Sequence, residues 1–327
     1  MKLTPTTPTP TPTPTLVKKP TVNGVAQEGI RLIIAEADYQ APLVICTSGA
    51  PGAGKSRLIG TSPGDYIGLI ATESKSKQTV TRTATQFGKQ VVLPDKDLIR
   101  VGNPVLISNL PNTCIVIGDA KHKDVTPGKI QDEMQEIADR ITLDSDHPTC
   151  CKRHYYRWHC NRVKYSAFLM FEDSRIKTIA IDPMGQFVDD VSYANYGLTG
   201  VIDPKEFGFA PRQDMNNEIR DFLNLLSGKH LVLTHHLKDV WKDGKPTNKK
   251  KPASQFSDIG HYATVMVEQT GPSGRDIGED DPRYILSVKD CQANAELIGL
   301  DLLQDDDITF GNLAALVYPD AAEGAFD

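Results

Sequence analysis

Residues 49–56 are Gly49-Ala50-Pro51-Gly52-Ala53-Gly54-Lys55-Ser56, which match the pattern G-x-x-x-x-G-K-[ST] at every fixed position. Glycines let the backbone wrap around a phosphate with its N–H groups pointing inward. A short apolar run at residues 42–46 precedes the loop as a buried strand would, and residues 57–59 follow it as the start of a helix. A chance glycine-rich turn would lack these flanks, so we expect a phosphate-binding loop. Its candidate residues are Gly49, Ala50, Pro51, Gly52, Ala53, Gly54, Lys55, Ser56 and Arg57.

A nucleotide bound in this loop needs further groups around it. The Lys55 ammonium is expected to reach the β- and γ-phosphates, and the Ser56 hydroxyl to bind magnesium. A second magnesium group is commonly an Asp at the end of a buried strand, and the apolar run at residues 177–181 ends in Asp182. The alternative for Asp182 is a carboxylate that caps the next turn. The loop upstream favours the magnesium role, so ATP and Mg²⁺ are the predicted ligands.

Hydrolysis also needs a group that orients the attacking water. Many ATPases with this loop place a Glu directly after the strand-end Asp, but Pro183 occupies that position here and cannot do this. Glu73, which follows the apolar run at residues 66–71, is the candidate instead. The alternative for Glu73 is an exposed side chain at a helix N-terminus. We predict that Glu73 orients the water.

Short apolar runs alternate with helix-like segments along the chain, which predicts an α/β fold with a mainly parallel sheet flanked by helices. Strands are predicted at residues 42–46, 66–71, 114–117, 177–181, 230–234, 263–267 and 284–288, and the last two of these are expected to be the final strands. Helices are predicted at residues 29–37, 74–87, 129–141 and 215–226.

These elements resemble the RecA-like P-loop ATPases, and more closely the phage-encoded group described as single-strand-annealing or recombination proteins. The motifs that carry the resemblance are Gly54-Lys55-Ser56, Ala71-Thr72-Glu73, Ile181-Asp182-Pro183 and Thr234-His235-His236. The resemblance spans roughly residues 40–290 and implies a RecA-like fold with Glu73 as the catalytic glutamate. It also implies that His236, or next His235, senses the γ-phosphate and signals to a loop on single-stranded DNA. Pro183-Met184 and the Cys/His-rich residues 147–160 depart from the family pattern.

The segment after the proposed sensor is basic. Residues 237–251 contain six Lys and two Asp, a local net charge of +4, together with Trp241. Lysines on phosphates and an aromatic ring under a base are what single-strand binding uses, and the candidates are Trp241, Lys249, Lys250 and Lys251. The alternative is a solvated hairpin that turns at Asp243-Gly244. Its position after the sensor favours DNA.

A second basic stretch, residues 147–164, contains five Lys and Arg residues, three Cys and three His. Cys150, Cys151, His154 and Cys160 could supply the four ligands that zinc needs. A surface patch that stacks on DNA is a further alternative for this stretch. We favour a surface helix with a basic face over the zinc site, because the spacing is not a clean pair of C-x-x-C units.

Composition limits which partners and which cell compartment are expected for this chain. The chain of 327 residues has 36 Lys and Arg and 42 Asp and Glu, a net charge of −6, so contact with nucleic acid should be local. It shows no apolar run long enough for a membrane helix and no apolar signal core, and six cysteines do not make a disulfide scaffold in a chain this long. We expect a cytoplasmic protein, in the host cytoplasm if it is phage-encoded.

The predicted organisation is a disordered Thr/Pro-rich tail at residues 1–21 and a RecA-like domain at residues 22–327, with a basic Cys/His-rich insertion at about residues 144–165. We expect a magnesium-dependent ATPase that acts on single-stranded DNA in phage recombination, replication or repair, and that forms a homo-oligomer. A nucleotide-regulated scaffold with little turnover is the alternative. A small-molecule phosphotransferase is a third reading, but the sequence shows no compact arginine-rich lid.

Overall fold

The computed structural model describes residues 42–94, 152–196, 210–242, 244–252, 258–271, 283–321 and 326, together with residues 21–22 and 25–26. The chain divides into two compact units, Met1–Tyr39 and Gln40–Asp327. In the first unit, strands β1 (Thr21–Val22) and β2 (Val25–Ala26) pair antiparallel. The predicted tail apart from Thr21, and the predicted elements at residues 29–37, 114–117 and 129–141, lie outside the described residues.

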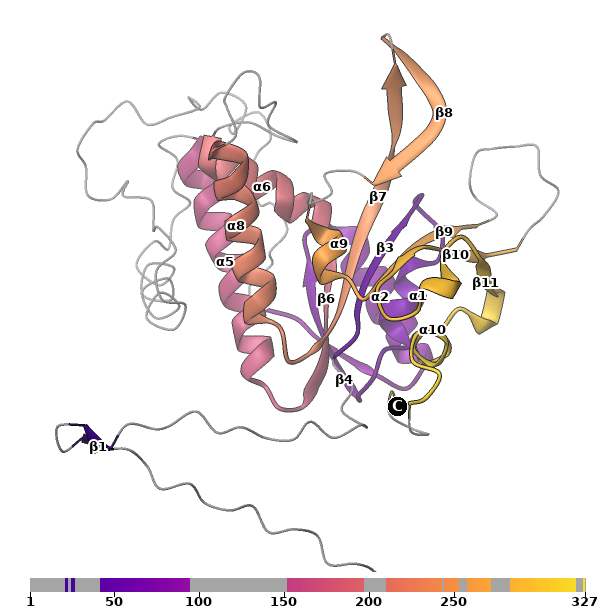
Figure 1. Cartoon of the computed structure of the whole chain (residues 1–327), viewed down its shortest axis with the longest axis horizontal. Coiled ribbons are helices and arrows are strands. Elements are labelled where there is room, and N and C mark those ends of the chain that lie inside the picture. Colours follow the sequence, from indigo (N-terminus) through magenta and orange to yellow (C-terminus); the bar gives the residue numbers. More distant parts are fainter. Residues whose placement is uncertain are drawn as a thin grey trace, which may run out of the picture. The chain divides into compact units, whose positions relative to one another are not determined.

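Nine strands of the described part form one sheet in the second unit (Figure 1). They are β3 (Val44–Gly49), β4 (Tyr66–Ala71), β5 (Gln90–Val92), β6 (Ile176–Asp182), β7 (His230–Lys242), β8 (Lys245–Pro252), β9 (Val265–Thr270), β10 (Ile285–Cys291) and β11 (Asp301–Gln304). Their order is β11-β10-β9-β3-β7-β6-β4-β5, with β8 paired to β7 beside this path. The pairs from β9 through to β5 are parallel, whereas β10 is antiparallel to β9 and β11. The predicted α/β fold with a mainly parallel sheet is therefore confirmed.

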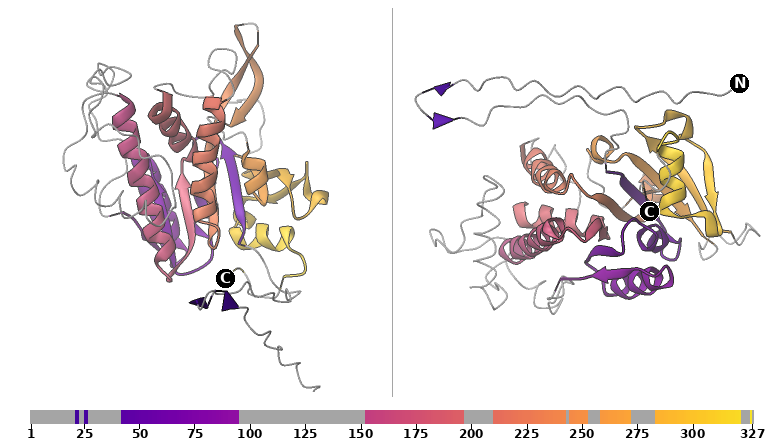
Figure 2. Two further views of the ribbon diagram at one scale, coloured as in Figure 1. Left: turned by 60° about the vertical axis from the view of Figure 1, so that its left-hand side comes forward. Right: turned by 90° about the horizontal axis from the view of Figure 1, so that it is seen from below.

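Helices cover both faces of this sheet (Figure 2). The residues of α5 (Lys152–Glu172), α6 (Met184–Tyr196) and α8 (Ala210–Leu225) join one hydrophobic core, and those of α1 (Lys55–Gly60), α2 (Ser74–Gln86) and α10 (Phe310–Val317) join the other. Successive strand residues point to opposite faces, so in β6 Ile179 and Ile181 enter the first core and Ala180 enters the second. Strands buried on both sides are apolar throughout, which explains why apolar runs in the sequence located them.

Most predicted elements that fall on described residues occur at or near their predicted positions. β4 occupies residues 66–71 as predicted, and α2 ends at Gln86, one residue before the predicted end. β7 continues to Lys242 instead of ending at residue 234. The prediction that residues 284–288 form the final strand is wrong, because β11 and then α10 follow β10. None of the helices in the described part is long and apolar enough to cross a membrane.

The basic residues 152–164 lie in α5, but the prediction of a surface helix with a basic face is wrong. Arg157, Arg162 and Lys164 are buried. The Glu218 carboxylate of α8 accepts hydrogen bonds from Arg157 and, at 2.5 Å, from Lys164. Burial by itself would raise the pKa of Glu218, but the positive charges of Lys164 and Arg157 outweigh it and lower this pKa to about 2. These basic side chains therefore form a buried ion cluster between α5 and α8.

Glu218→Gln is expected to lower the free energy of unfolding by about 3–5 kcal/mol, because it leaves two buried cations without their counter-charge. Urea denaturation measures this change. Asp221→Asn is the matched control, since Asp221 is an exposed acid on the same helix. Equal effects of the two substitutions would show that the ion cluster does not stabilise the fold.

The same cluster predicts a pH dependence. Because folding lowers the pKa of Glu218 from the ordinary 4.5 to about 2, its contribution to stability is complete above pH 4.5 and is lost as the pH falls toward 2. The Glu218→Gln variant should lack this component, so its difference in stability from the wild type should shrink on acidification.

Candidate nucleotide-binding site

The loop between β3 and α1 has the backbone that its glycines predict. Gly52 and Gly54 have φ angles of 85° and 93°, in the left-handed region that favours glycine. At Gly49 a Cβ atom would lie 2.6 Å from the carbonyl oxygen of Gln269 in β9, so only glycine fits beside the neighbouring strand. The loop is closed by a hydrogen bond from the Ala53 N–H to the Ala50 carbonyl at 3.1 Å.

Lys55 opens α1, and its side chain folds back over the loop. Its Nζ donates to the carbonyl oxygens of Gly49 at 2.7 Å and Ala50 at 3.0 Å. Burial lowers the pKa of Lys55, and the negative charges of Asp182 and Glu73 partly offset this. The ammonium is thus fixed above the loop and within electrostatic reach of both predicted acids.

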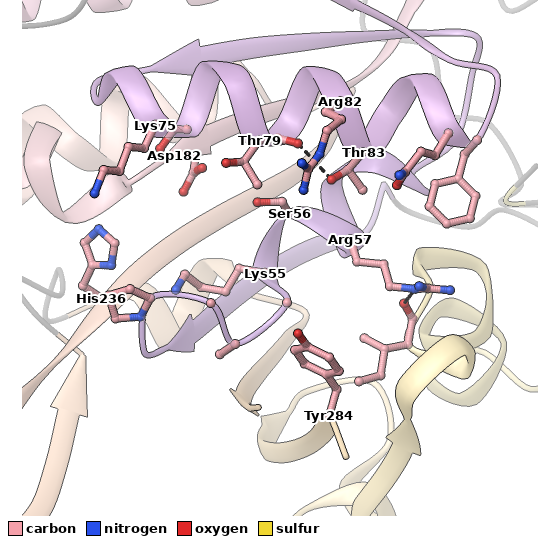
Figure 3. A pocket seen from close by; sticks show the side chains of 18 of the residues that line it. Lys55, Ser56, Arg57, Lys75, Thr79, Arg82, Thr83, Asp182, His236 and Tyr284 are labelled. Atoms are coloured by element: carbon pink, nitrogen blue, oxygen red, sulfur yellow. Dashed lines mark hydrogen bonds between the residues drawn. The ribbon is translucent and has the colours of Figure 1, made fainter. Parts of the chain in front are cut away.

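Asp182 ends β6, where it is buried beside the loop. The Thr234 hydroxyl of β7 donates to Asp182 Oδ1, which orients the carboxylate. Ser56, one residue after Lys55, lines the same pocket as Asp182 (Figure 3). A hydroxyl and a carboxylate are the hard oxygen donors that Mg²⁺ prefers, so this pair fits the predicted metal.

Glu73 and His236 meet at the carboxyl edge of the sheet. Glu73 follows β4 and precedes α2, and His236 lies opposite Gly49 in the β3–β7 register. His236 Nε2 lies 3.3 Å from Glu73 Oε1. The neighbouring His235 is fully buried, whereas the His236 side chain is 37% exposed. This agrees with the expectation that adjacent strand residues point to opposite sides, and it places His236 on the pocket side.

These side chains line one pocket of about 810 Å³. The sequence-predicted residues that line it are Pro51, Gly52, Ala53, Gly54, Lys55, Ser56, Arg57, Glu73, Asp182 and His236. Its other walls come from α2 and from the C-terminal part of the chain, and they are Lys75, Ser76, Thr79, Arg82, Thr83, Gln86, Phe87, Tyr284, Asp305, Asp306 and Ile308. The sequence therefore located the phosphate end of the pocket and missed most of its remaining walls.

Some of the missed residues carry a signal in the sequence. Lys75, Thr79 and Arg82 recur at helical spacing after Glu73, so they share the face of α2 that looks onto the loop. Tyr284 carries no such signal. It reaches the pocket because β10 lies two places from β3 in the sheet, which local patterns do not reveal.

The proposed zinc ligands fall largely outside the described part of the chain. Cys150, Cys151 and the side chain of His154 are not described. Cys160 is a fully buried free thiol in α5, and burial raises its pKa well above the ordinary value. Within the described residues no group of three or more His, Cys, Asp or Glu side chains could hold a metal. The zinc site stays a prediction.

The basic residues after His236 form a hairpin that projects beyond the sheet (Figure 1). β7 and β8 pair antiparallel, with Trp241 opposite Pro246 and Lys238 opposite Lys251. Gly244, at the turn, has a φ angle of 73°. A hairpin at this position is what the sequence suggested as the alternative to a DNA-binding loop. Lys249, Lys250 and Lys251 are exposed on β8, and their contact with DNA stays a prediction.

The fold thus brings Lys55, Ser56, Glu73, Asp182 and His236 into one pocket, from the loop after β3 and from strands β4, β6 and β7. Glycine geometry, a buried ammonium and two carboxylates suit a bound polyphosphate with its metal ion. The chain matches no protein-family model and no curated protein, so the case for its chemistry is made by these residues.

Proposed function

We propose that this chain is a magnesium-dependent ATPase with a RecA-like core that acts on single-stranded DNA. The observation that carries the proposal is that Lys55, Ser56, Asp182 and Glu73 line a single pocket. Loop, ammonium, strand-end carboxylate and a second carboxylate are the parts that phosphoryl transfer by this type of site requires. Glu73 faces the pocket, as a residue that orients water must.

The order of the strands supports the RecA-like assignment. β7 lies between β3, which carries the loop, and β6, which ends in Asp182. The part of β7 where its pairing with β3 ends therefore lies between the phosphate loop and the proposed metal-binding carboxylate. His236 is the last residue of β7 that pairs with β3, and it contacts Glu73. This is the position that a sensor of the γ-phosphate would need.

Each residue has a distinct task in the proposed reaction. The loop N–H groups and Lys55 hold the β- and γ-phosphates, and Ser56 and Asp182 would hold Mg²⁺, which neutralises phosphate charge when it is bound. Asp182 is already oriented by Thr234. Glu73 accepts a hydrogen bond from the attacking water and aligns it with the γ-phosphorus.

Single-stranded DNA is the proposed partner of the β7–β8 hairpin. The exposed lysines of β8 give this hairpin a positive charge in a chain of net charge −6, and phosphate contacts dominate nucleic-acid affinity. The same strand β7 contains His236 and the first half of the hairpin. A shift of His236 on nucleotide binding would therefore be passed along a continuous strand to the lysines.

One observation favours a second candidate, a nucleotide-regulated binding protein with little turnover. The contact between Glu73 and His236 occupies a carboxylate that hydrolysis needs for water. ATP turnover measured with and without single-stranded DNA separates the two candidates. DNA-stimulated turnover supports the ATPase, and tight ATP binding with no turnover in either condition supports the binding protein.

Changing Lys249, Lys250 and Lys251 together to Ala is expected to weaken binding to single-stranded DNA and to flatten its salt dependence. Each phosphate neutralised on a single strand contributes about 0.7 to the slope of log affinity against log salt, so the slope should fall by about 2. Fluorescence anisotropy over a range of salt concentrations measures this. Lys289→Ala, an exposed lysine outside the hairpin, is the control.

Trp241→Ala is the companion variant in the same hairpin. If a base stacks on Trp241, the substitution costs about 1–3 kcal/mol of binding free energy and leaves the salt slope nearly unchanged. If neither variant alters the binding of a wild type that binds well, the hairpin is not the DNA surface.

A further inference from the structure

A buried amide lies next to the phosphate loop. Gln269 belongs to β9 and lies directly opposite Gly49 in the parallel β3–β9 register, and its side chain is fully buried. A Cβ atom at Gly54 would lie 3.9 Å from Gln269 Oε1, so the amide is also close to the last glycine of the loop. Gln269 is therefore beside the loop at both of its ends, although it does not line the pocket.

This amide has no hydrogen-bond partner among the described residues, at either Oε1 or Nε2. Side chains alternate along a strand, so Gln269 faces the same side of the sheet as Val265 and Val267, which belong to the core that contains α1 and α2. A buried amide in apolar surroundings destabilises a fold unless it forms hydrogen bonds. Its place beside a glycine-rich loop indicates a second conformation of the loop, in which the amide has partners.

The contacts of Lys55 show which groups that second conformation would offer. Lys55 Nζ donates to the carbonyl oxygens of Gly49 and Ala50. In the proposed reaction this ammonium turns toward the β- and γ-phosphates, and it has only three N–H donors. Loop carbonyls then lose a donor, and Gln269 Nε2 has two N–H groups beside Gly49 that can replace it.

We infer that Gln269 is a positioning residue that stabilises the phosphate-bound conformation of the loop, by donating from Nε2 to the loop carbonyls that Lys55 releases. The inference rests on the proposed function of the pocket and adds to it a residue from a neighbouring strand. Gln269 acts through the loop backbone and not on the phosphates. Its amide should therefore contribute to ATP affinity and not to the stability of the protein without ATP.

Gln269→Met removes the amide and keeps an unbranched side chain of similar length. Because the amide has no partner among the described residues, we expect the Tm without ATP to stay the same or to rise. The affinity for Mg–ATP should fall about ten-fold, since a loop carbonyl would lack its donor in the bound form. Thermal unfolding and a calorimetric titration with Mg–ATP, both on the full chain, measure the two quantities. A residue that only stabilises the fold would show the opposite pattern.

Thr47→Val is the matched control. Thr47 is also fully buried, and its Oγ1 has no partner within the part of the chain that the structure describes. It lies on β3 opposite Val267 and does not line the pocket. This variant too should keep or raise the Tm, but it should bind Mg–ATP with wild-type affinity. Gln269→Leu is the second variant at the test position, in case methionine does not pack there.

The outcomes separate the inference from the proposed function. Normal ATP affinity in Gln269→Met would overturn the inference, and so would an equal loss of affinity in Thr47→Val. If Gln269→Met and Gln269→Leu both lower the Tm without ATP, or both fail to fold, the amide supports the fold itself and the inference is again overturned. If the wild type does not bind Mg–ATP, the proposed function fails, and the inference fails with it.

Discussion

Lys55→Ala is expected to reduce the affinity for ATP by about 10- to 100-fold. The variant removes a charge-assisted contact to the phosphates, a class that contributes roughly 1.5–3 kcal/mol, and ten-fold in affinity corresponds to about 1.4 kcal/mol. In this chain the Lys55 ammonium is fixed above the loop by the Gly49 and Ala50 carbonyls. Burial lowers the pKa of Lys55, and the negative charge of bound phosphates would favour the protonated form again.

Thermal unfolding with and without Mg–ATP measures this loss. A ligand at 100 times its dissociation constant stabilises the folded state by about 2.7 kcal/mol. The wild type should therefore show a clear upward shift in Tm, and Lys55→Ala should show a smaller one. Lys289→Ala removes an exposed lysine outside the pocket and should keep the shift. The two variants must unfold at similar temperatures without ATP. A normal ATP-induced shift in Lys55→Ala would show that the nucleotide site has been wrongly assigned.

The fold was predictable from the sequence wherever a strand is buried on both faces. β4 is a continuous apolar run and β6 is apolar from Ile179 to Ile181, so each stands out from its polar neighbours. β7 illustrates the limit of this signal. Its first half lies inside the sheet and is apolar, but its second half forms a two-stranded ribbon of mostly polar residues, in which no hydrophobic pattern marks the strand.

The basic residues of α5 were wrongly predicted to form an exposed face, and the reason is physical. The sequence shows Arg157 and Lys164 with no acid close by, which is typical of a solvent-exposed basic face. Their acid is Glu218, 61 residues from Arg157 and 54 from Lys164, and it reaches them only because α8 packs beside α5. Local composition cannot distinguish a lysine in water from one that pairs with a distant acid.

The residues of the candidate site also fall into those that the sequence predicts and those that only the fold brings to the pocket. Lys55, Glu73 and Asp182 were predictable because each lies at a strand end or in a loop whose residue types chemistry restricts. Arg57 meets its partner Ile308 across 251 positions of the chain, and Tyr284 reaches the loop through a sheet order that no local pattern encodes. The phosphate end of the pocket is therefore predictable from the sequence, whereas the walls formed by Phe87 and Tyr284 are seen only in the fold.

Glu73→Gln is expected to keep ATP binding and to lower the rate of hydrolysis by about 10²–10⁴-fold, the usual contribution of a positioned general base. Glutamine keeps the shape of the side chain and can still contact His236, which lies 3.3 Å from Glu73. It removes one negative charge from a pocket that binds a polyanion, so the affinity for ATP should not fall. Pro183 offers no carboxylate that could take over.

Single-turnover hydrolysis and an ATP-binding titration, run on the same preparations, measure the two quantities separately. Glu296→Gln, an exposed acid outside the pocket, is the control and should match the wild type in both. Hydrolysis at the wild-type rate in Glu73→Gln would assign the water to another residue. His236→Ala then separates the two proposed functions. If the His236 contact holds Glu73 away from water, its removal should raise turnover without DNA, whereas a sensor role predicts that basal turnover persists and stimulation by DNA is lost.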